Sequence, residues 1–344
     1  MKQASFILAA TTALRGRSIP RSFLVSLQRI TGLFRRFRSA GRCRRPGKCR
    51  RAAYATVVGR ARRSKNALEL EATLDSFLVN GYPLAVETAG AGAPLILIHG
   101  ALSDYRNWQP QMAEFSKHFR VYAPSLRHCW PERWDGVGDG YSIPQHVADI
   151  VTFLAQLGEE KVCLVGHSRG GDVALQVAAA QPQRIERLVL AEPVPGRLDP
   201  DLAPQDPHAQ DRPRSPIIAK AVQLIKSGDI EAGVQTFVEF SGGPGAWQKR
   251  SPERQGIARD NAYTLLGLAS PPGPPIGKAT LRALSMPTLL VGGELTEPVF
   301  LDLLDLLERN IPGARRIAIA NAAHGMNRDN PEQFNVDVLR FLVS

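Results

Sequence analysis

A serine between two glycines offers the clearest chemistry in this chain. Residues 161–165 form a short apolar run that ends in Gly166-His167-Ser168-Arg169-Gly170, and residues 172–180 behind it are rich in Ala, Leu, Val and Gln. A sharp turn from strand to helix holds such a serine clear of the sheet, and the amino end of the helix beneath it can bind an anion. The segment therefore predicts a nucleophilic Ser168.

The elements that must position this serine alternate along the chain from about residue 69. The Asn80-Gly81 turn predicts an opening hairpin between residues 73–79 and 84–88. Later strands are expected at residues 93–100, 119–124, 161–165, 187–191, 287–292 and 315–319, and helices at 108–117, 143–157, 299–309 and 331–342. This alternation predicts an α/β fold with a mostly parallel sheet covered by helices on both faces.

Three motifs in this order resemble the α/β-hydrolase family, from about residue 73 to the end of the chain. They are His99-Gly100, the turn at Gly166–Gly170 and a late His324. The resemblance implies an eight-stranded type of sheet and the chain order nucleophile, acid, histidine. His324 fits the last place because its loop follows the final expected strand, and it would take the proton of Ser168.

The acid that would orient His324 has more than one candidate. The family usually places an aspartate after the penultimate strand, but this position holds Thr296, which cannot carry a negative charge. The family also tolerates an acid one strand earlier, where Glu192 stands, and we favour Glu192. Glu297 and Glu294 are the alternatives. The resemblance further implies that the backbone N–H groups of Ala101 and Arg169 form the oxyanion hole.

The predicted domain organisation is a basic tail (residues 1–68), an α/β-hydrolase core (69–192 and 287–344) and an inserted helical cap (193–286). Helical periodicity within the insertion is found at 217–226, 230–240 and 252–266. Four aromatic residues are candidates for the substrate pocket, although each could instead pack cap against core: Trp108, Trp130, Phe237 and Trp247.

These residues together favour a serine hydrolase without a cofactor that cleaves a carboxylic ester or lactone of a small molecule through an acyl-enzyme. A carbon–carbon hydrolase or a metal-free haloperoxidase or perhydrolase could use the same three residues. Thr296 is the support for a third hypothesis, a non-catalytic member that binds a small ligand. Epoxide hydrolases and dehalogenases of this fold are disfavoured because they use a carboxylate where this chain has Ser168.

The net charge of +11 is unevenly distributed along the chain. Residues 1–68 hold 18 of the 43 Lys and Arg residues and none of the 32 Asp and Glu residues, so the remainder is acidic. Beyond Phe34, Phe37 and Tyr54, the basic residues of the tail lack interleaved aromatic side chains for base stacking, so we expect no nucleic-acid partner. Its apolar patch at residues 6–14 is too short to span a membrane. We expect a cytoplasmic protein, or an organelle-targeted one if the tail is a transit peptide.

The four cysteines form no metal signature, and nothing in the sequence assigns an oligomeric state.

Overall fold

The computed structural model describes residues 72–344 apart from residue 139 and residues 203–215 and 269–272. Residues Ala67–Ser344 form one compact unit. The predictions made for residues 1–68, including the tail itself, lie outside the described residues.

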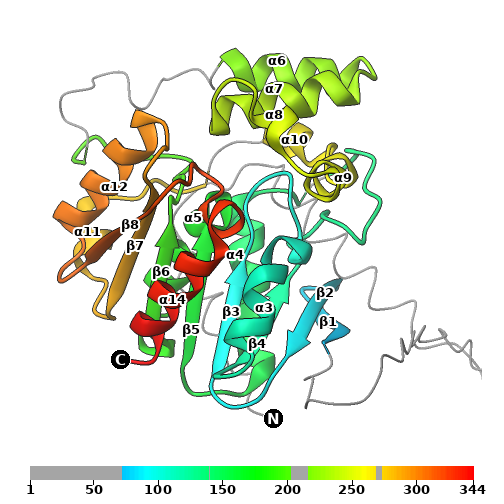
Figure 1. Ribbon diagram of the computed structural model, residues 1–344. Coiled ribbons are helices and arrows are strands. Elements are labelled where there is room, and N and C mark those ends of the chain that lie inside the picture. Colours follow the sequence, from blue (N-terminus) through cyan, green and yellow to red (C-terminus); the bar gives the residue numbers. More distant parts are fainter. Residues whose placement is uncertain (1–71, 139, 203–215, 269–272) are drawn as a thin grey trace, which may run out of the picture. The chain divides into compact units, whose positions relative to one another are not determined.

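An eight-stranded sheet runs through the unit in the order β1-β2-β4-β3-β5-β6-β7-β8 (Figure 1). The antiparallel pairs are β1 with β2 and β2 with β4, and all other neighbours are parallel. The strands are β1 (Thr73–Val79), β2 (Tyr82–Ala89), β3 (Pro94–Ile98), β4 (Arg120–Pro124), β5 (Val162–His167), β6 (Ile185–Ala191), β7 (Thr288–Gly293) and β8 (Arg315–Ile319). The mostly parallel α/β sheet predicted from the sequence is confirmed.

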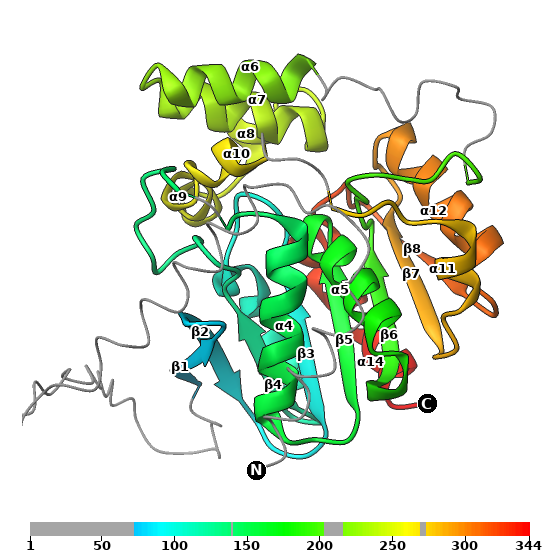
Figure 2. The same ribbon diagram turned by 180° about the vertical axis from the view of Figure 1, so that it is seen from behind.

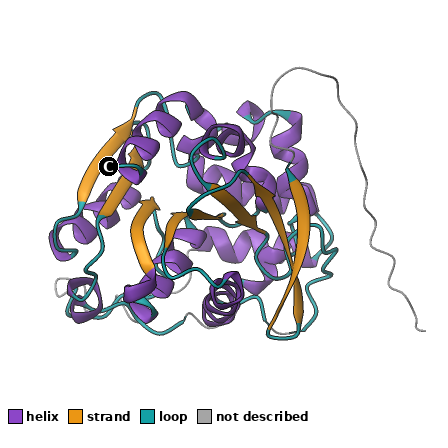
Figure 3. Cartoon of the chain, turned by 90° about the horizontal axis from the view of Figure 1, so that it is seen from below, coloured by secondary structure: helices purple, strands orange, loops and turns teal. Residues whose placement is uncertain are grey.

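Helices cover both faces of the sheet, which is why the central strands are apolar throughout (Figures 2 and 3). One face packs against α4 (Ile143–Leu157), α5 (Arg169–Ala180), α11 (Lys278–Arg282) and α12 (Pro298–Asn310). The other packs against α3 (Gln109–Phe115), α13 (Met326–Asp329) and α14 (Pro331–Leu342). Every residue of β3 and of β5 is buried between these two layers.

Local signals in the sequence fix where several helices begin and end. Helix α4 occupies the predicted range, since the Ser142 hydroxyl accepts a hydrogen bond from the Gln145 N–H and Gly158 ends the helix in the left-handed conformation. Helix α14 begins in the same way at Asn330. The helix expected around residue 108 instead opens with the 3-10 turn η1 (Tyr105–Trp108), and a second 3-10 turn, η2 (Pro182–Arg184), leads into β6.

Five helices between β6 and β7 lie beyond the carboxyl ends of the strands (Figures 1 and 2). They are α6 (Pro216–Lys226), α7 (Ile230–Gly242), α8 (Ala246–Lys249), α9 (Pro252–Asp260) and α10 (Thr264–Gly267), and we refer to them as the cap helices. They have an apolar core of their own, centred on Val234, Val238 and Leu265. The boundaries predicted for a cap, residues 193 and 286, stay a prediction.

The single helix predicted for residues 252–266 is wrong, because Asn261 interrupts it. Its buried amide nitrogen donates to Asp104 Oδ2 at 2.7 Å and to the Ile257 carbonyl at 2.8 Å, while its oxygen accepts from the Trp130 N–H at 2.8 Å. These bonds attach the cap helices to two loops of the core, and helical periodicity carries no sign of such distant partners. Within the described residues, no helix is both long enough and apolar enough to cross a membrane.

Candidate active site

Ser168 stands at the turn between β5 and α5 with φ 54° and ψ −121°. Such positive φ values are costly for a residue with a side chain and are found mostly at functional sites. The turn is possible because the residues two positions away on either side of Ser168 are glycines. A Cβ on Gly170 would lie 2.3 Å from the His99 carbonyl oxygen, and one on Gly166 would lie 2.5 Å from the Gly170 carbonyl oxygen. The Gly-x-Ser-x-Gly pattern is therefore a packing requirement of this turn.

His324 reaches Ser168 from the loop that follows β8. Its Nε2 lies 2.9 Å from Ser168 Oγ, which is hydrogen-bonding distance. The ring stacks on Phe300 of α12, with centroids 4.1 Å apart and planes 17° apart. The Asn321 N–H donates to a Glu294 carboxylate oxygen at 2.9 Å, so Glu294 secures the backbone of this loop and does not face the imidazole.

Glu192 is the carboxylate that contacts His324. It stands directly after β6 with φ 41°, is only 1% exposed, and its Oε2 lies 2.6 Å from His324 Nδ1. Its Oε1 accepts the Gly293 N–H at 2.7 Å. A buried carboxylate fixed by a backbone N–H in this way is well suited to orient an imidazole. Of the three carboxylates weighed from the sequence, the structure brings Glu192 to His324; Glu297 lies at the start of α12, near Gly243.

Thr296 takes part in this arrangement as a donor. Its hydroxyl donates a hydrogen bond of 2.9 Å to Glu192 Oε2, the same oxygen that faces His324. Thr296 stands at the position where an aspartate was expected. It therefore supports Glu192, a glutamate that follows the neighbouring strand β6. The sequence showed the missing aspartate, but only the pairing of β6 with β7 brings Thr296 and Glu192 together.

Two further histidines hold the loops around Ser168. His99 accepts the Leu126 N–H at 2.9 Å through Nε2, so its Nδ1–H donates to the Gly100 carbonyl at 2.8 Å. The Nε2–H of His167 donates to the His324 carbonyl at 2.7 Å. Burial lowers the pKa of both rings, that of His167 to about 3, so both are neutral at physiological pH.

The predicted oxyanion donors lie beside the serine. Arg169 is the first residue of α5, and the N–H groups of a first helical turn have no acceptor within the helix. Ala101 follows Gly100, and the His99 ring fixes the Gly100 carbonyl by a hydrogen bond. Both Ala101 and Arg169 line the cavity that contains Ser168. Their role as oxyanion donors stays a prediction.

A cavity of about 1310 Å³ opens above Ser168 and His324, between the carboxyl edge of the sheet and the cap helices. Phe237, a predicted pocket residue, lines it, together with Ile218, Phe240 and Leu268. Part of the wall on the side of the cap helices is therefore apolar. Tyr141 and Phe300, which the sequence analysis did not single out, also line the cavity.

The three tryptophans predicted to line the pocket lie elsewhere. Trp108 is fully buried and packs against Phe334 of α14. Trp130 lies under the guanidinium of Arg106, 4.9 Å from its ring centroid, and Trp247 is buried within the apolar core of the cap helices. Their large apolar area made them plausible pocket residues, but the same area favours packing of core and cap.

Comparison with known proteins agrees with this architecture. The family model described as alpha/beta hydrolase fold matches residues 93–223. The chain has the α/β-hydrolase fold. Its sequence is 26% identical, over 76% of this chain and 99% of the relative, to a pimeloyl-[acyl-carrier protein] methyl ester esterase of Aeromonas salmonicida. It is 31% identical, over 38% of this chain, to a soluble epoxide hydrolase of Corynebacterium sp., and covers only 45% of that relative's length.

Solved structures share the fold of this α/β-hydrolase. An enol-lactonase from Burkholderia xenovorans superposes with a TM-score of 0.62, covering 78% of this chain and all of the other, at 21% sequence identity. A carboxylesterase from Bacillus subtilis superposes with a TM-score of 0.60 at 20% identity, covering 80% of this chain and 92% of the other. Identities this low show a common fold, which confirms the fold class inferred from the sequence.

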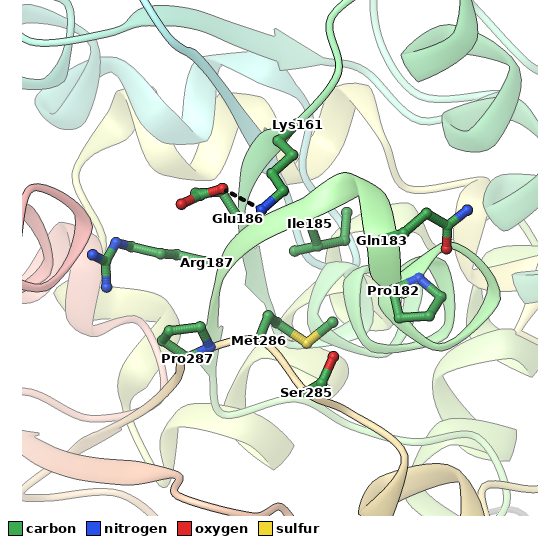
Figure 4. A pocket seen from close by; sticks show the side chains of 9 residues that line it. All are labelled: Lys161, Pro182, Gln183, Ile185, Glu186, Arg187, Ser285, Met286 and Pro287. Atoms are coloured by element: carbon green, nitrogen blue, oxygen red, sulfur yellow. Dashed lines mark ion pairs between the residues drawn. The ribbon is translucent and has the colours of Figure 1, made fainter.

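The opposite edge of the sheet in this α/β-hydrolase carries a second, smaller pocket of about 410 Å³ (Figure 4). Lys161 and Glu186, which line it at the amino ends of β5 and β6, form an ion pair of 3.2 Å. A charge pair of this kind on an exposed surface is satisfied without a ligand.

Within residues 72–138, 140–202, 216–268 and 273–344, no three His, Cys, Asp or Glu side chains lie close enough together to hold a metal ion. Cys129 and Cys163 are both free and buried. Burial raises the pKa of both thiols, that of Cys163 to about 11, so neither is an available nucleophile at neutral pH.

Proposed function

We propose that this α/β-hydrolase is a serine hydrolase that cleaves carboxylic esters or lactones through an acyl-enzyme on Ser168. The observation that carries the proposal is the unbroken line of contacts from Ser168 Oγ to His324 Nε2 (2.9 Å) and from His324 Nδ1 to Glu192 Oε2 (2.6 Å). This is the order of nucleophile, general base and orienting acid that activates a serine.

The first half of the reaction would transfer the acyl group to the enzyme. The buried Glu192 carboxylate accepts the Nδ1–H of His324, which leaves Nε2 free to take the Ser168 proton as the oxygen attacks the acyl carbon. The N–H groups of Ala101 and Arg169 would stabilise the negative charge on the former carbonyl oxygen. As the intermediate collapses, His324 returns the proton to the departing alkoxide, which leaves as an alcohol.

The second half would release the acid. Water enters the cavity, His324 Nε2 removes its proton, and the hydroxide attacks the acyl carbon of the ester on Ser168. The second intermediate collapses with return of the proton to Ser168, so the serine is regenerated and a carboxylic acid is released. Because the attacking and leaving oxygens use the same Nε2 in turn, a single histidine serves both halves.

Three observations support this reaction. A nucleophilic serine in place of a carboxylate disfavours epoxide opening, although an epoxide hydrolase is among the relatives. The contact of Glu192 with His324 removes the reason for a non-catalytic member, which was the lack of an acid at Thr296. The names of the similar proteins, an esterase and an enol-lactonase, support an ester-like bond as the target.

The test is hydrolysis of p-nitrophenyl butyrate by the purified full-length chain, followed in a stopped-flow spectrophotometer. An acyl-enzyme predicts a burst of p-nitrophenolate that approaches one equivalent of enzyme when deacylation is slower than acylation. Ser168→Ala and His324→Ala should lose the burst and the turnover together. Turnover that survives in Ser168→Ala would refute the proposal.

A further inference from the structure

One wall of the large cavity is strongly cationic. Arg250, Arg254 and Arg328 line it, and Asp329 is the only acid among its lining residues in the described part of the chain. Arg250 and Arg254 come from the segment that joins and begins the cap helices α8 and α9, and Arg328 comes from α13, just after His324. The cationic wall thus combines residues of cap and core.

Two of these arginines are neutralised by carboxylates. Arg254 Nη1 lies 2.8 Å from Asp329 Oδ1, and Arg328 Nη2 lies 3.0 Å from Glu253 Oε1. Arg250 has no carboxylate within 4.0 Å among the described residues. The group of three cations and two anions therefore retains one positive charge, and Arg250 carries it.

Arg250 is partly withdrawn from water, which makes an unpaired charge expensive. Burial, followed by the charge of Arg254, lowers the pKa of Arg250 to about 10, so the guanidinium is still protonated at neutral pH. An ion removed from water is normally paired or bound to a ligand. A guanidinium that faces a cavity without a protein partner is thus a candidate for binding an anion from outside.

The cationic wall lies on the His324 side of the reacting centre. A Cβ on Gly325, the residue after His324, would lie 2.8 Å from Arg254 Nη2. The ring centroid of His167 lies 5.0 Å from that of His324, and the charges of Arg250 and Arg254 act on His167. The apolar wall formed by Ile218, Phe237 and Leu268 completes a cavity with one apolar and one positive region.

Arg169, the cation next to Ser168, is less suited to this role. Its guanidinium lies over the Tyr141 ring, 4.6 Å from the centroid. Its Nε and Nη2 atoms are buried without a hydrogen-bond partner, so they are closed to a molecule in the cavity. Arg197 and Lys249 also line the cavity, but both side chains are exposed to solvent. Arg250 is therefore the partly buried cation of the cationic wall that has no carboxylate partner among the described residues.

We propose that Arg250 binds a carboxylate of the substrate, so that the preferred substrates are half-esters or lactones that carry one free carboxylate. A guanidinium matches a carboxylate with two parallel hydrogen bonds, and the partly buried Arg250 has no such partner among the described residues. This inference deepens the proposed function and rests on it, because it names the substrate class of the same site.

The experiment compares each of a series of methyl half-esters, from monomethyl succinate to monomethyl suberate, with the neutral methyl ester of matching chain length. The readout is the ratio of kcat/KM for the anionic ester to that for the neutral ester. The wild-type chain should prefer at least one half-ester by about 10- to 100-fold, the range expected for a desolvated hydrogen-bonded charge pair. Arg250→Gln should remove that preference, and Arg250→Lys should retain part of it.

Lys220→Gln is the matched control, because it removes one positive charge from α6 at an exposed position that does not line the cavity. Its ratio should equal that of the wild type. An equal ratio for wild type and Arg250→Gln, or the same loss in Lys220→Gln, would overturn the assignment of Arg250.

A binding measurement separates this inference from the proposed function. Isothermal titration calorimetry of each half-ester of the series with Ser168→Ala requires no turnover. Weaker binding by about tenfold or more in Ser168→Ala/Arg250→Gln supports the carboxylate site even if the wild-type chain hydrolyses no ester. Equal binding by the two proteins refutes the site even if esters are hydrolysed.

Discussion

Replacement of Glu192 by Gln tests whether the carboxylate after β6 controls the tautomer of His324. The two side chains are nearly isosteric, so the change alters charge and hydrogen bonding more than packing. Gly293 N–H donates to Glu192 Oε1 at 2.7 Å, so a glutamine will place its only oxygen there. Its NH2 group then faces His324 Nδ1, where the carboxylate oxygen had been.

The consequence is a histidine in the wrong tautomer. An NH2 group donates to Nδ1, which moves the ring proton to Nε2, and Nε2 can then no longer accept the proton of Ser168. The equivalent change in a serine-protease triad lowers kcat about 10⁴-fold. Since Glu192 is only 1% exposed and water cannot replace it, we expect a loss of about 10³- to 10⁴-fold here, or about 4 to 5.5 kcal/mol of transition-state stabilisation.

The assay is kcat/KM for p-nitrophenyl butyrate, with far-ultraviolet circular dichroism and a thermal melt to verify folding. Glu297→Gln is the control, since it removes the same charge at the start of α12 and should retain activity within about threefold. Glu192→Gln with activity within tenfold of wild type would refute the reasoning. So would a collapse in Glu297→Gln.

Three further predictions concern groups around the site. Thr296→Val removes the 2.9 Å hydrogen bond to Glu192 Oε2, so kcat should fall about tenfold, and an unchanged kcat would show that this bond does not orient the acid. Burial, then the nearby Asp104 carboxylate, raises the pKa of Glu87 to about 7, so folding takes up a proton between about pH 4.5 and 7 and stability falls as pH rises through this window. Urea unfolding at pH 5 and 8 should show a smaller difference for Glu87→Gln than for wild type, and an equal difference would contradict the shift. Asn261→Ala deprives Asp104 of a buried donor at 2.7 Å and should lower the free energy of unfolding by about 1–3 kcal/mol. A loss below about 0.5 kcal/mol would refute the role of Asn261 in attaching the cap helices to the core.

The order of strands and helices could be predicted from the sequence because its signals are local. Continuous apolar runs mark strands covered on both faces, and Ser142 and Gly158 mark the two ends of α4. The turn at Ser168 is also local, since the glycines that permit it stand two residues away on either side. These features need no knowledge of distant contacts.

The parts that could not be predicted depend on contacts between distant segments. The break at Asn261 is explained by Asp104, 157 positions earlier, and the support that Thr296 gives to Glu192 spans 104 positions. Size and loop position favour a pocket role for the tryptophans, but Trp108 and Trp247 are buried in two apolar cores and Trp130 lies under Arg106. The unmatched charge of Arg250 depends on two ion pairs, Arg254 with Asp329 and Arg328 with Glu253. Each pair joins residues 75 positions apart, so the sequence does not indicate it.

The central claim, that Ser168 is activated by His324, is tested most directly by intact-protein mass spectrometry after brief exposure to a fluorophosphonate. Only a serine with an adjacent base reacts quickly with such a reagent. The account predicts a single adduct that maps to Ser168 and that is absent from Ser168→Ala and much slower in His324→Ala. A wild-type chain that remains unmodified, or an adduct that persists in Ser168→Ala, would contradict it.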